Sequence, residues 1–320
     1  MIFLYHVAAI TAAYLLDKGF GDPAKAWHPV MMMGKVISFF DIKLNQGRFR
    51  KLKGACALWA LLLIIGFISC LILYMLFILH PLLFIACEAL IIWLMIGGRS
   101  MEKAAMSIQE PLQNKNITEA RSRTAMIVSR DTSKMDEEGL TRAVLESIGE
   151  NISDSVTAPL FYALLGGAPL AVCCRFINTA DAMTGYMTPE YRQYGWAAAR
   201  TDDAVNFIPA RITALLLAIA GTTLNYSSFG HSLRVIHKHA RKHESPNSGF
   251  GEAGMAAVLN VTLGGKTPYK HGLVNRPLFG DGKRKLEPLL IVEGILMWRR
   301  TIFLFIVICW VIGGVVYVLA

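Results

Sequence analysis

The sequence predicts an all-α integral membrane protein with four to six membrane helices, some broken or re-entrant, and large helical loops. Three observations support this fold class. Of the 320 residues, 54% are hydrophobic and only 17% are charged, a balance that soluble proteins of this length seldom show. The mean hydropathy is +0.44. The apolar residues also gather into runs close to the ~20 residues that cross a hydrocarbon core ~30 Å thick.

The clearest membrane segments are two runs that form a hairpin turning at His80-Pro81. The first, 55–79, carries no charge, and the second, 82–98, is interrupted only by Glu88, which we expect to be paired inside the bundle. A third uncharged run, 301–320, ends the chain. The apolar start at 2–16 lacks a basic segment before it. We therefore interpret it as a retained membrane segment rather than a cleaved signal peptide.

Two further apolar stretches carry helix breakers. The stretch 156–174 contains Pro159, Gly166, Gly167 and Pro169, and the stretch 207–224 begins with Ile-Pro-Ala-Arg at 208–211. Broken helices are tolerated at membrane depth where they line protein or a water-filled cavity. If both stretches cross, the protein has six spans, and if neither crosses it has four; the sequence leaves both numbers open.

Domain organisation and location follow from these segments. The Lys and Arg residues, which give a formal charge of +9, concentrate in polar segments such as 48–53 and 234–242. Basic flanks are typical of cytosolic loops, so we expect no nucleic-acid partner, and a multi-pass protein of the cell (inner or plasma) membrane with its active face in the cytoplasm. We expect one membrane domain over 1–320, with apolar segments at about 2–16, 55–79, 82–98, 156–174, 207–224 and 301–320 and polar loops at 17–54, 99–155, 175–206 and 225–300.

An acidic stripe precedes the first broken stretch. Glu146, Glu150 and Asp154 are spaced i, i+4 and i+8, which places them on one face of a helix. Carboxylates so close together repel one another, so a positive group is expected among them. That group is Mg²⁺ in one interpretation, since Mg²⁺ takes one or two carboxylates plus phosphate oxygens. The alternative is a solvated helix face with an Arg142–Glu146 pair.

A second polar group lies just before the other broken stretch. Asp202 and Asp203 stand four and three residues before Asn206, so their oxygens can converge, and Arg200 and Arg211 flank them. Acidic groups framed by arginines suit a metal–polyphosphate site, because a guanidinium grips phosphate with two bonds. The alternative is a charge cluster at the membrane interface.

A glycine-rich segment at 244–254 contains the pattern GxGxxG. Basic polar sequence precedes it where a dinucleotide-binding fold requires a strand, and no acidic residue follows about 20 residues later, so we reject a Rossmann site. A loop leading into a helix still offers N–H groups to an anion, which makes Ser245, Asn247, Ser248 and Gly249 binding candidates. The segment 260–267 misses the Walker A pattern because Asn260 replaces its first glycine.

Taken together, the motifs of this chain resemble the adenosylcobinamide-phosphate synthase family of cobalamin biosynthesis over nearly the whole length. The resemblance rests on GDPAKAWHPVMMMGKVI at 21–37, SRDTSKMD at 129–136, RAVLESIGENISDSVTAPLFYALLGGAP at 142–169, NTADAMTGY at 178–186, YGWAAARTDDAVNFIPARITAL at 194–215, SPNSGFGEAGMAAVL at 245–259 and GDG at 280–282. It implies that the protein joins a propionate carboxylate of adenosylcobyric acid to (R)-1-amino-2-propanol or its O-phosphate. ATP would drive this amide ligation and Mg²⁺ is the expected metal.

Site roles are assigned on that basis. A carboxylate must be activated before an amine attacks it, typically as an acyl phosphate, and that step needs a metal and cations. The expected catalytic residues are Glu146, Glu150, Arg200, Asp202 and Asp203. The expected metal ligands are Glu146, Glu150, Asp154, Asp202 and Asp203. The expected substrate and nucleotide contacts are Asp22, His28, Arg130, Asn151, Asn178, Asp181, Asn206, Arg211, Ser245, Asn247, Ser248 and Gly249.

The expected partners are a corrinoid substrate, aminopropanol or its phosphate, and the lipid bilayer. A homo-oligomer or an assembly with other cobalamin-pathway enzymes is compatible with the sequence. Two other functions stay open: an intramembrane Mg²⁺-dependent prenyl-diphosphate transferase, and a transporter or regulatory membrane protein of the same fold.

Overall fold

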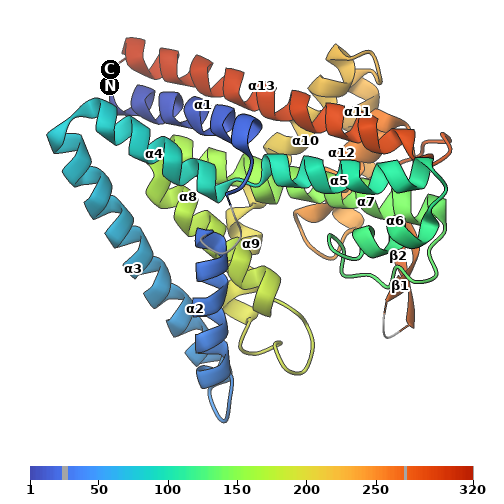
Figure 1. The fold of residues 1–320 in the computed structure, drawn as a ribbon, viewed down its shortest axis with the longest axis horizontal. Helices are drawn as coiled ribbons and strands as arrows, with labels where there is room; N and C mark the ends of the chain where they lie inside the picture. Colours follow the sequence, from blue (N-terminus) through green and yellow to red (C-terminus); the bar gives the residue numbers. More distant parts are fainter. Residues whose placement is uncertain (24–27, 270–271, 320) are drawn as a thin grey trace. The chain divides into compact units, whose positions relative to one another are not determined.

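The computed structural model describes residues 1–23, 28–269 and 272–319, so positions 24–27 of the motif at 21–37 lie outside the described residues. The chain is almost entirely helical (Figure 1). Its elements are α1 (Ile2–Phe20), α2 (Pro29–Leu44), α3 (Arg50–Leu79), α4 (Pro81–Met95), α5 (Gly98–Gln113), α6 (Ile117–Thr124), α7 (Glu137–Ile152), the π-helix η2 (Ser153–Thr157), α8 (Ala158–Thr184), α9 (Trp196–Val205), α10 (Phe207–Thr223), α11 (Phe229–His239), the 3₁₀-helix η3 (Ala240–Lys242), α12 (Ser248–Leu259), β1 (Leu263–Tyr269), β2 (Gly272–Phe279) and α13 (Leu289–Leu319).

The number of membrane helices falls at the lower end of the predicted range. Among the described residues, four helical segments are long and apolar enough to cross a bilayer: Arg50–Leu79, Pro81–Gln113, Glu137–Thr184 and Leu289–Leu319. The pair α9 and α10, bent by 45°, makes a fifth if it counts as one broken span. The apolar start at 2–16 forms α1, which is not among these segments. The all-α membrane class is confirmed.

The chain packs into two compact units. Unit 1 contains Met1–Gly98, Asp154–Asn206 and the part of α13 from Ile306, and unit 2 contains Arg99–Ser153 and Phe207–Phe305. Each unit is therefore built from segments far apart in the sequence. The prediction of one membrane domain over 1–320 stays a prediction.

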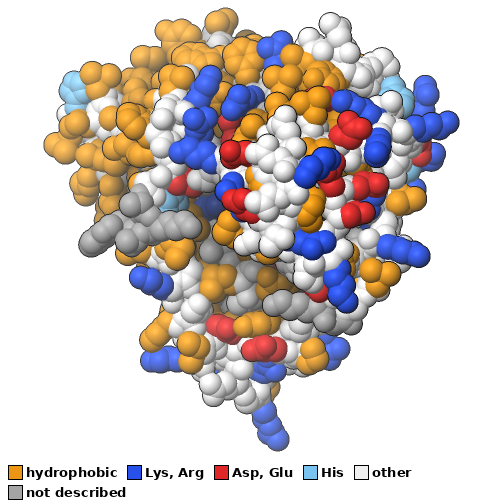
Figure 2. Space-filling view, turned by 45° about the vertical axis from the view of Figure 1, so that its right-hand side comes forward, with side chains coloured by type: hydrophobic (Ala, Val, Ile, Leu, Met, Phe, Trp, Pro, Cys, Tyr) orange, Lys and Arg blue, Asp and Glu red, His pale blue; other side chains and the backbone are white. Residues whose placement is uncertain are grey.

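Apolar side chains cover the outer faces of the long helices. Only 17% of the most hydropathic part of α3 is buried inside the protein, and Leu63, Phe67 and Leu71 on α3 are among its exposed residues. Figure 2 shows hydrophobic side chains over a continuous expanse of one face, with Lys, Arg, Asp and Glu gathered elsewhere on it. Such an exposed apolar expanse is typical of a surface that faces lipid.

Unit 1 contains the predicted hairpin of α3 and α4 (Figure 1). His80 caps the second helix by accepting the Leu82 N–H at Nδ1 over 3.1 Å, and Pro81 occupies the first helical position, where its missing N–H costs nothing. The turn at His80-Pro81 is confirmed.

The break predicted in the stretch 156–174 is confirmed at Gly166 and Gly167, inside α8. Gly167 has φ +69°, and a Cβ there would lie 2.2 Å from Glu88 Oε1. Glu88 accepts the Ala168 N–H over 3.0 Å, and His6 Nδ1 lies 2.8 Å from the same oxygen. The carboxylate thus satisfies a backbone donor that the break exposes, which explains the single charge in the second apolar run.

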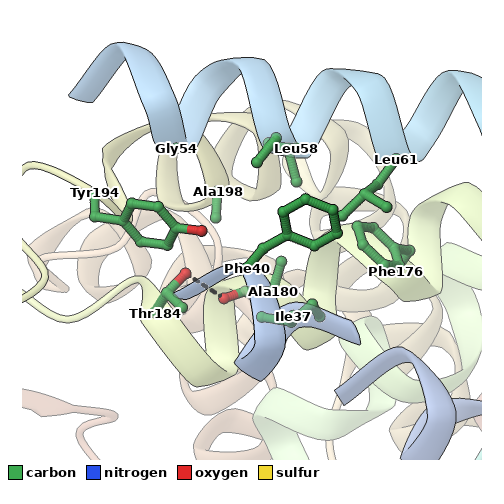
Figure 3. Close-up of a pocket in the computed structure, with 11 residues that line it drawn as sticks. Ile37, Phe40, Gly54, Leu58, Leu61, Phe176, Ala180, Thr184, Tyr194 and Ala198 are labelled. Carbon is green, nitrogen blue, oxygen red and sulfur yellow. Dashed lines mark hydrogen bonds between the residues drawn. The ribbon is translucent and has the colours of Figure 1, made fainter. Parts of the chain in front are cut away.

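A small apolar cavity of about 30 Å³ lies in unit 1, between α2, α3, α8 and α9 (Figure 3). Phe40, Leu61 and Phe176 line it, and the Tyr194 ring closes another side. A Cβ on Gly54 would lie 2.1 Å from the Tyr194 carbonyl oxygen, so glycine is required where α3 meets this loop. A space of one water volume holds no substrate, and we assign it to packing.

Helix α12 forms the centre of unit 2, where it packs against α7, α10 and α11. Every residue from Gly251 to Leu259 is buried. Gly149 on α7 faces Gly251, and a Cβ on Gly251 would lie 2.1 Å from the Gly149 carbonyl oxygen. The GxGxxG pattern therefore serves close helix packing. Among the described residues no strand comes before α12, whereas a dinucleotide-binding fold requires one directly before it.

One feature of unit 2 was not predicted. The polar loop predicted at 225–300, in a fold class with helical loops, contains an antiparallel hairpin of β1 and β2, with a bulge between Gly264 and Gly265. The near match to Walker A at 260–267 lies largely in β1, and a strand rather than a helix follows it. It is therefore not a phosphate-binding loop of that type.

Candidate functional site

A buried ion cluster lies in unit 2, where α7, α12, β2 and two loops meet. Its members, which we call the Glu146 cluster, are Arg130, Glu146, His243, Glu252 and Arg276. The Glu146 and Glu252 side chains are only 2% and 1% exposed. Buried carboxylates require cationic partners and complete hydrogen bonding to be stable.

Glu146 meets that requirement with three donors. Arg276 Nη1 donates to Oε2 over 2.6 Å, Arg130 donates to the same oxygen, and the Gly264 N–H donates to Oε1 over 2.6 Å. The positive group expected beside the acidic stripe is thus a pair of guanidinium groups. The alternative of a solvated face with an Arg142–Glu146 pair is wrong, because Glu146 is buried and Arg142 pairs with Glu138.

Arg276 connects the two carboxylates. Its Nη1 binds Glu146 while its Nη2 binds Glu252 Oε1 over 2.7 Å. Burial alone would lower the pKa of Arg276, but the Glu252 and Glu146 carboxylates outweigh this effect and raise it. Arg276 is therefore always charged, and its planar group holds both acids in a fixed geometry.

Burial shifts the pKa values of Glu252 and His243 in favour of their uncharged forms. Burial and the Glu146 carboxylate raise the pKa of Glu252 to about 8, against the opposing effect of Arg276. Its Oε2 is buried and has no hydrogen-bond partner among the described residues. Burial and Arg276 lower the pKa of His243, whose Nδ1 accepts the Ser245 N–H over 2.9 Å.

The sequence predicted only part of this cluster. Glu146 and Arg130 were both candidates, whereas His243, Glu252 and Arg276 were missed. Glu252 had a detectable signal, since it is the one acid within the small-residue helix α12. Arg276 had none, because the hairpin that carries it was not predicted.

Glu150 lies one turn after Glu146 but has a different environment. It is half-buried and accepts a hydrogen bond from Ser248 Oγ over 2.9 Å. Ser245 Oγ accepts the N–H groups of Asn247 and Ser248 over 3.2 and 3.4 Å. The loop before α12 thus uses these two N–H groups itself.

Several other predicted contacts of unit 2 have structural roles. Gly249 packs against Ala240, whose carbonyl oxygen would lie 2.1 Å from a Cβ. Arg211 stacks on the Phe207 and Phe250 rings, 3.4 and 4.3 Å from their centroids, and bonds the Phe207 carbonyl over 2.6 Å. Asn151 donates to the Ser147 carbonyl over 2.8 Å.

Unit 1 brings together a second polar group around Arg175, which the sequence analysis missed. Its guanidinium interacts electrostatically with Asp22 and Asp154. His28 caps α2 by accepting the Val30 N–H at Nδ1 over 3.3 Å. Burial lowers the pKa of His28, which Asp22 raises and Arg175 lowers. Asp154 lies in the π-helix η2, which shifts its register relative to α7.

The remaining predicted residues also belong to unit 1. Arg200 pairs with Asp203 over 3.5 Å at the partly exposed surface of α9, and Asp202 is half-buried. Asn206, 1% exposed, ends α9. Asn178 and Asp181 are half-buried near the end of α8, where Asp181 lies beside Gly185.

The predicted carboxylates do not fit a resident metal centre of three or more side chains. No group of three or more His, Cys, Asp or Glu in residues 1–23, 28–269 and 272–319 is arranged to hold a metal ion. Glu146 in particular already receives two guanidinium groups and a backbone N–H. Mg²⁺ bound by one or two carboxylates and a nucleotide is compatible with this arrangement.

Comparison with known proteins gives consistent results. The family model described as "CobD/Cbib protein" matches residues 10–298. The chain is 42% identical to "Cobalamin biosynthesis protein CobD" of Halalkalibacterium halodurans over 98% of both chains. It is 38% identical to the protein of that name from Photorhabdus laumondii subsp. laumondii, over 88% of this chain and 89% of the relative. It is 35% identical to "Cobalamin biosynthesis protein CbiB" of Salmonella arizonae, over 96% and 99%.

A search of solved structures found no match. The family match covers the Glu146 cluster and the polar group around Arg175, and the relatives align over nearly their whole length. The chain therefore belongs to the CobD/Cbib protein family.

Proposed function

We propose that the protein is a carbon–nitrogen ligase of cobalamin biosynthesis. It joins adenosylcobyric acid to (R)-1-amino-2-propanol or its O-phosphate and hydrolyses ATP in doing so. The relatives' names support the pathway. The observation in the molecule that carries the proposal is the pair Arg130 and Arg276, held in place by buried carboxylates.

The arginine pair suits a substrate that carries negative charge. The Arg130 and Arg276 side chains are 11% and 12% exposed, whereas the carboxylates behind them are almost fully buried. The two arginines and His243, which is 18% exposed, are therefore the members of the cluster that a ligand can reach. Guanidinium groups fixed before the reaction stabilise charge on a phosphoryl group or a carboxylate without reorganisation. Glu146 is a positioning residue in this scheme.

Proton transfer is the second requirement of amide ligation. The amine must lose a proton to attack an activated carboxyl carbon, and a base with a pKa near the working pH is the most effective. Glu252, with its pKa of about 8 and its unpartnered Oε2, is the candidate to accept that proton in its ionised form. Mg²⁺ enters only as the counter-ion of ATP, and no step is assigned to a resident metal.

The proposed location is the cell membrane, with the Glu146 cluster on the cytoplasmic side. The basic segment 234–242 supports this orientation. In a Lys266→Cys variant, an impermeant maleimide should label the new thiol in inverted vesicles but not in intact cells. Labelling in intact cells would refute the orientation.

The activity itself is tested with the purified protein in detergent or nanodiscs. Adenosylcobyric acid, ATP, Mg²⁺ and either aminopropanol or its phosphate are supplied, and the corrinoid and nucleotide products are followed by mass spectrometry. The expected result is an amidated corrinoid that forms only with ATP. Product without ATP, or ATP-independent transport of the corrinoid into vesicles without covalent change, would refute the ligase.

A further inference from the structure

A basic pocket of about 250 Å³ lies in unit 2, beside the Glu146 cluster. The start of α7, the bulged end of the β hairpin and the segment 282–286 enclose it. Four cationic side chains and one anionic side chain line it, and they are Arg142, Lys283, Arg284, Lys285 and Glu138. None of the cations was a candidate ligand contact in the sequence analysis.

Three glycines, Gly264, Gly265 and Gly282, are among the residues that line the pocket. Gly264 and Gly265 have φ +82° and +83° at the bulge, and a Cβ on Gly264 would lie 1.9 Å from the Pro277 carbonyl oxygen. A Cβ on Gly282 would lie 2.0 Å from the Asn260 carbonyl carbon. Glycine is thus required at Gly264 and Gly282 by close contacts within the protein, and neither residue adds a side chain to the pocket. This accounts for the third residue of the GDG motif at 280–282.

The cations are not all neutralised by the protein. Arg284 forms two 2.5 Å bonds to Glu293, and Arg142 pairs with Glu138 over 2.5 Å. The Arg142 Nε is buried and donates no hydrogen bond to any described residue. Lys283 and Lys285 are exposed, and no ion pair to either is found in the described part of the chain. The pocket therefore presents two lysines without an ion-pair partner among the described residues, beside two arginines that carboxylates hold in place.

The pocket size decides the ligand class. A volume of 250 Å³ equals roughly eight water molecules at about 30 Å³ each. A polyphosphate chain or a small phosphate ester fits such a space. It does not enclose a corrin ring, and of a nucleotide it holds the phosphate chain only, since pockets that enclose drug-sized ligands start at about 300 Å³.

We infer that this pocket binds the phosphoryl groups of a substrate. The ligand is the polyphosphate of ATP or the phosphate ester of the amine, which present the same oxygens to Lys283, Lys285 and Arg142. Gly264 lines the pocket and its N–H donates to Glu146, so the pocket adjoins the Glu146 cluster directly. The choice of these ligands rests on the proposed ligase function, whereas the existence of the anion site does not.

Direct binding tests the inference in the full-length protein in zwitterionic detergent. The probes are inorganic tripolyphosphate, ATP, aminopropanol phosphate and unphosphorylated aminopropanol, each measured by calorimetry. The double variant Lys283→Gln/Lys285→Gln removes two charges, and Lys266→Gln, an exposed lysine on β1 outside the pocket, is the matched control. We expect the double variant to weaken at least one phosphorylated probe on the order of tenfold or more, and the control to bind as the wild type does.

The pattern of losses identifies the ligand. Parallel weakening of tripolyphosphate and ATP assigns the nucleotide, and weakening of aminopropanol phosphate alone assigns the amine. Unchanged binding of all three phosphorylated probes would overturn the inference. Tripolyphosphate binding needs no corrinoid, so this result is independent of whether amide ligation is observed.

A second measurement uses the wild-type protein and does not depend on a variant's folding. Acetylation of lysines by an amine-reactive reagent is followed by mass spectrometry with and without the phosphorylated probes. Lys283 and Lys285 should be protected by at least one of them while Lys266 is not. Equal reactivity of all three lysines with every probe would overturn the inference.

Discussion

The Glu146 cluster predicts that Glu146→Gln destabilises the protein strongly although it changes the side-chain shape very little. The wild-type carboxylate accepts from Arg276, Arg130 and the Gly264 N–H, and it is 2% exposed. The neutral amide has one acceptor oxygen and brings an NH₂ group to the arginines. Breaking a buried ion pair in this way costs about 3–5 kcal/mol.

Glu150→Gln is the matched control. Glu150 lies on the same helix, is half-buried and accepts one hydrogen bond from a neutral hydroxyl. A hydrogen bond of that kind contributes about 0.5–1.5 kcal/mol. Both variants replace a glutamate by glutamine, so the difference in their loss of stability measures the effect of burying Glu146 and pairing it with the arginines.

Thermal unfolding of the purified variants in detergent measures the difference. At roughly 2–4 °C per kcal/mol, Glu146→Gln should lower the Tm by about 6 °C or more, and Glu150→Gln by a few degrees at most. Equal shifts for the two variants would refute the inferred role of Glu146 as the buried anchor of Arg130 and Arg276.

Three other predictions follow from the same contacts. Arg276→Lys should reduce the rate of amide formation roughly tenfold or more in a steady-state assay, because one ammonium group cannot bind Glu146 and Glu252 as the two guanidinium nitrogens do; an unchanged rate would show that the bridge is dispensable. Gly167→Ala should lower the Tm clearly, because φ is +69° and the new Cβ would meet Glu88. Gly314→Ala is the control and should leave the Tm almost unchanged, because nothing lies within 4 Å of its Cβ. Equal Tm values for the two variants would contradict the inference that Glu88 caps a break at Gly167. The pKa of Glu252 is about 8 in the folded protein and near 4.5 in the unfolded chain, so between these pH values the folded state binds more protons than the unfolded state. The free energy of unfolding should therefore fall as the pH rises from about 4.5 to 8, by at most about 5 kcal/mol. Glu252→Gln should abolish that decline in denaturation curves recorded across this range, and persistence of the decline would assign it to another group.

The membrane architecture was largely predictable because it depends on local composition. Uncharged runs such as 55–79, the turn at His80-Pro81 and the break at Gly166 and Gly167 can each be identified within a window of some 20 residues. The pairing of Glu88 was also predictable, since a charge in an apolar run must find a partner. The identity of its partners, His6 and the Ala168 N–H, was not predictable, because each lies about 80 residues from Glu88, one before it and one after it.

The site was predictable only on the side of α7. Helical spacing placed Glu146 and Glu150 on one face, and repulsion required a positive group nearby. Arg276, which supplies much of it, lies 130 residues further on, in a hairpin that short polar strands rich in Gly and Pro did not reveal. The π-helix at Ser153–Thr157 likewise breaks the i+8 spacing that connected Asp154 to the stripe.

Oxygen transfer tests the proposed chemistry most directly. Adenosylcobyric acid labelled with ¹⁸O in its reactive carboxylate is incubated with the purified protein, ATP, Mg²⁺ and the amine. If ATP activates the carboxylate as an acyl phosphate, one labelled oxygen should leave with inorganic phosphate for each amide formed. Amide formation accompanied by unlabelled phosphate would contradict the account.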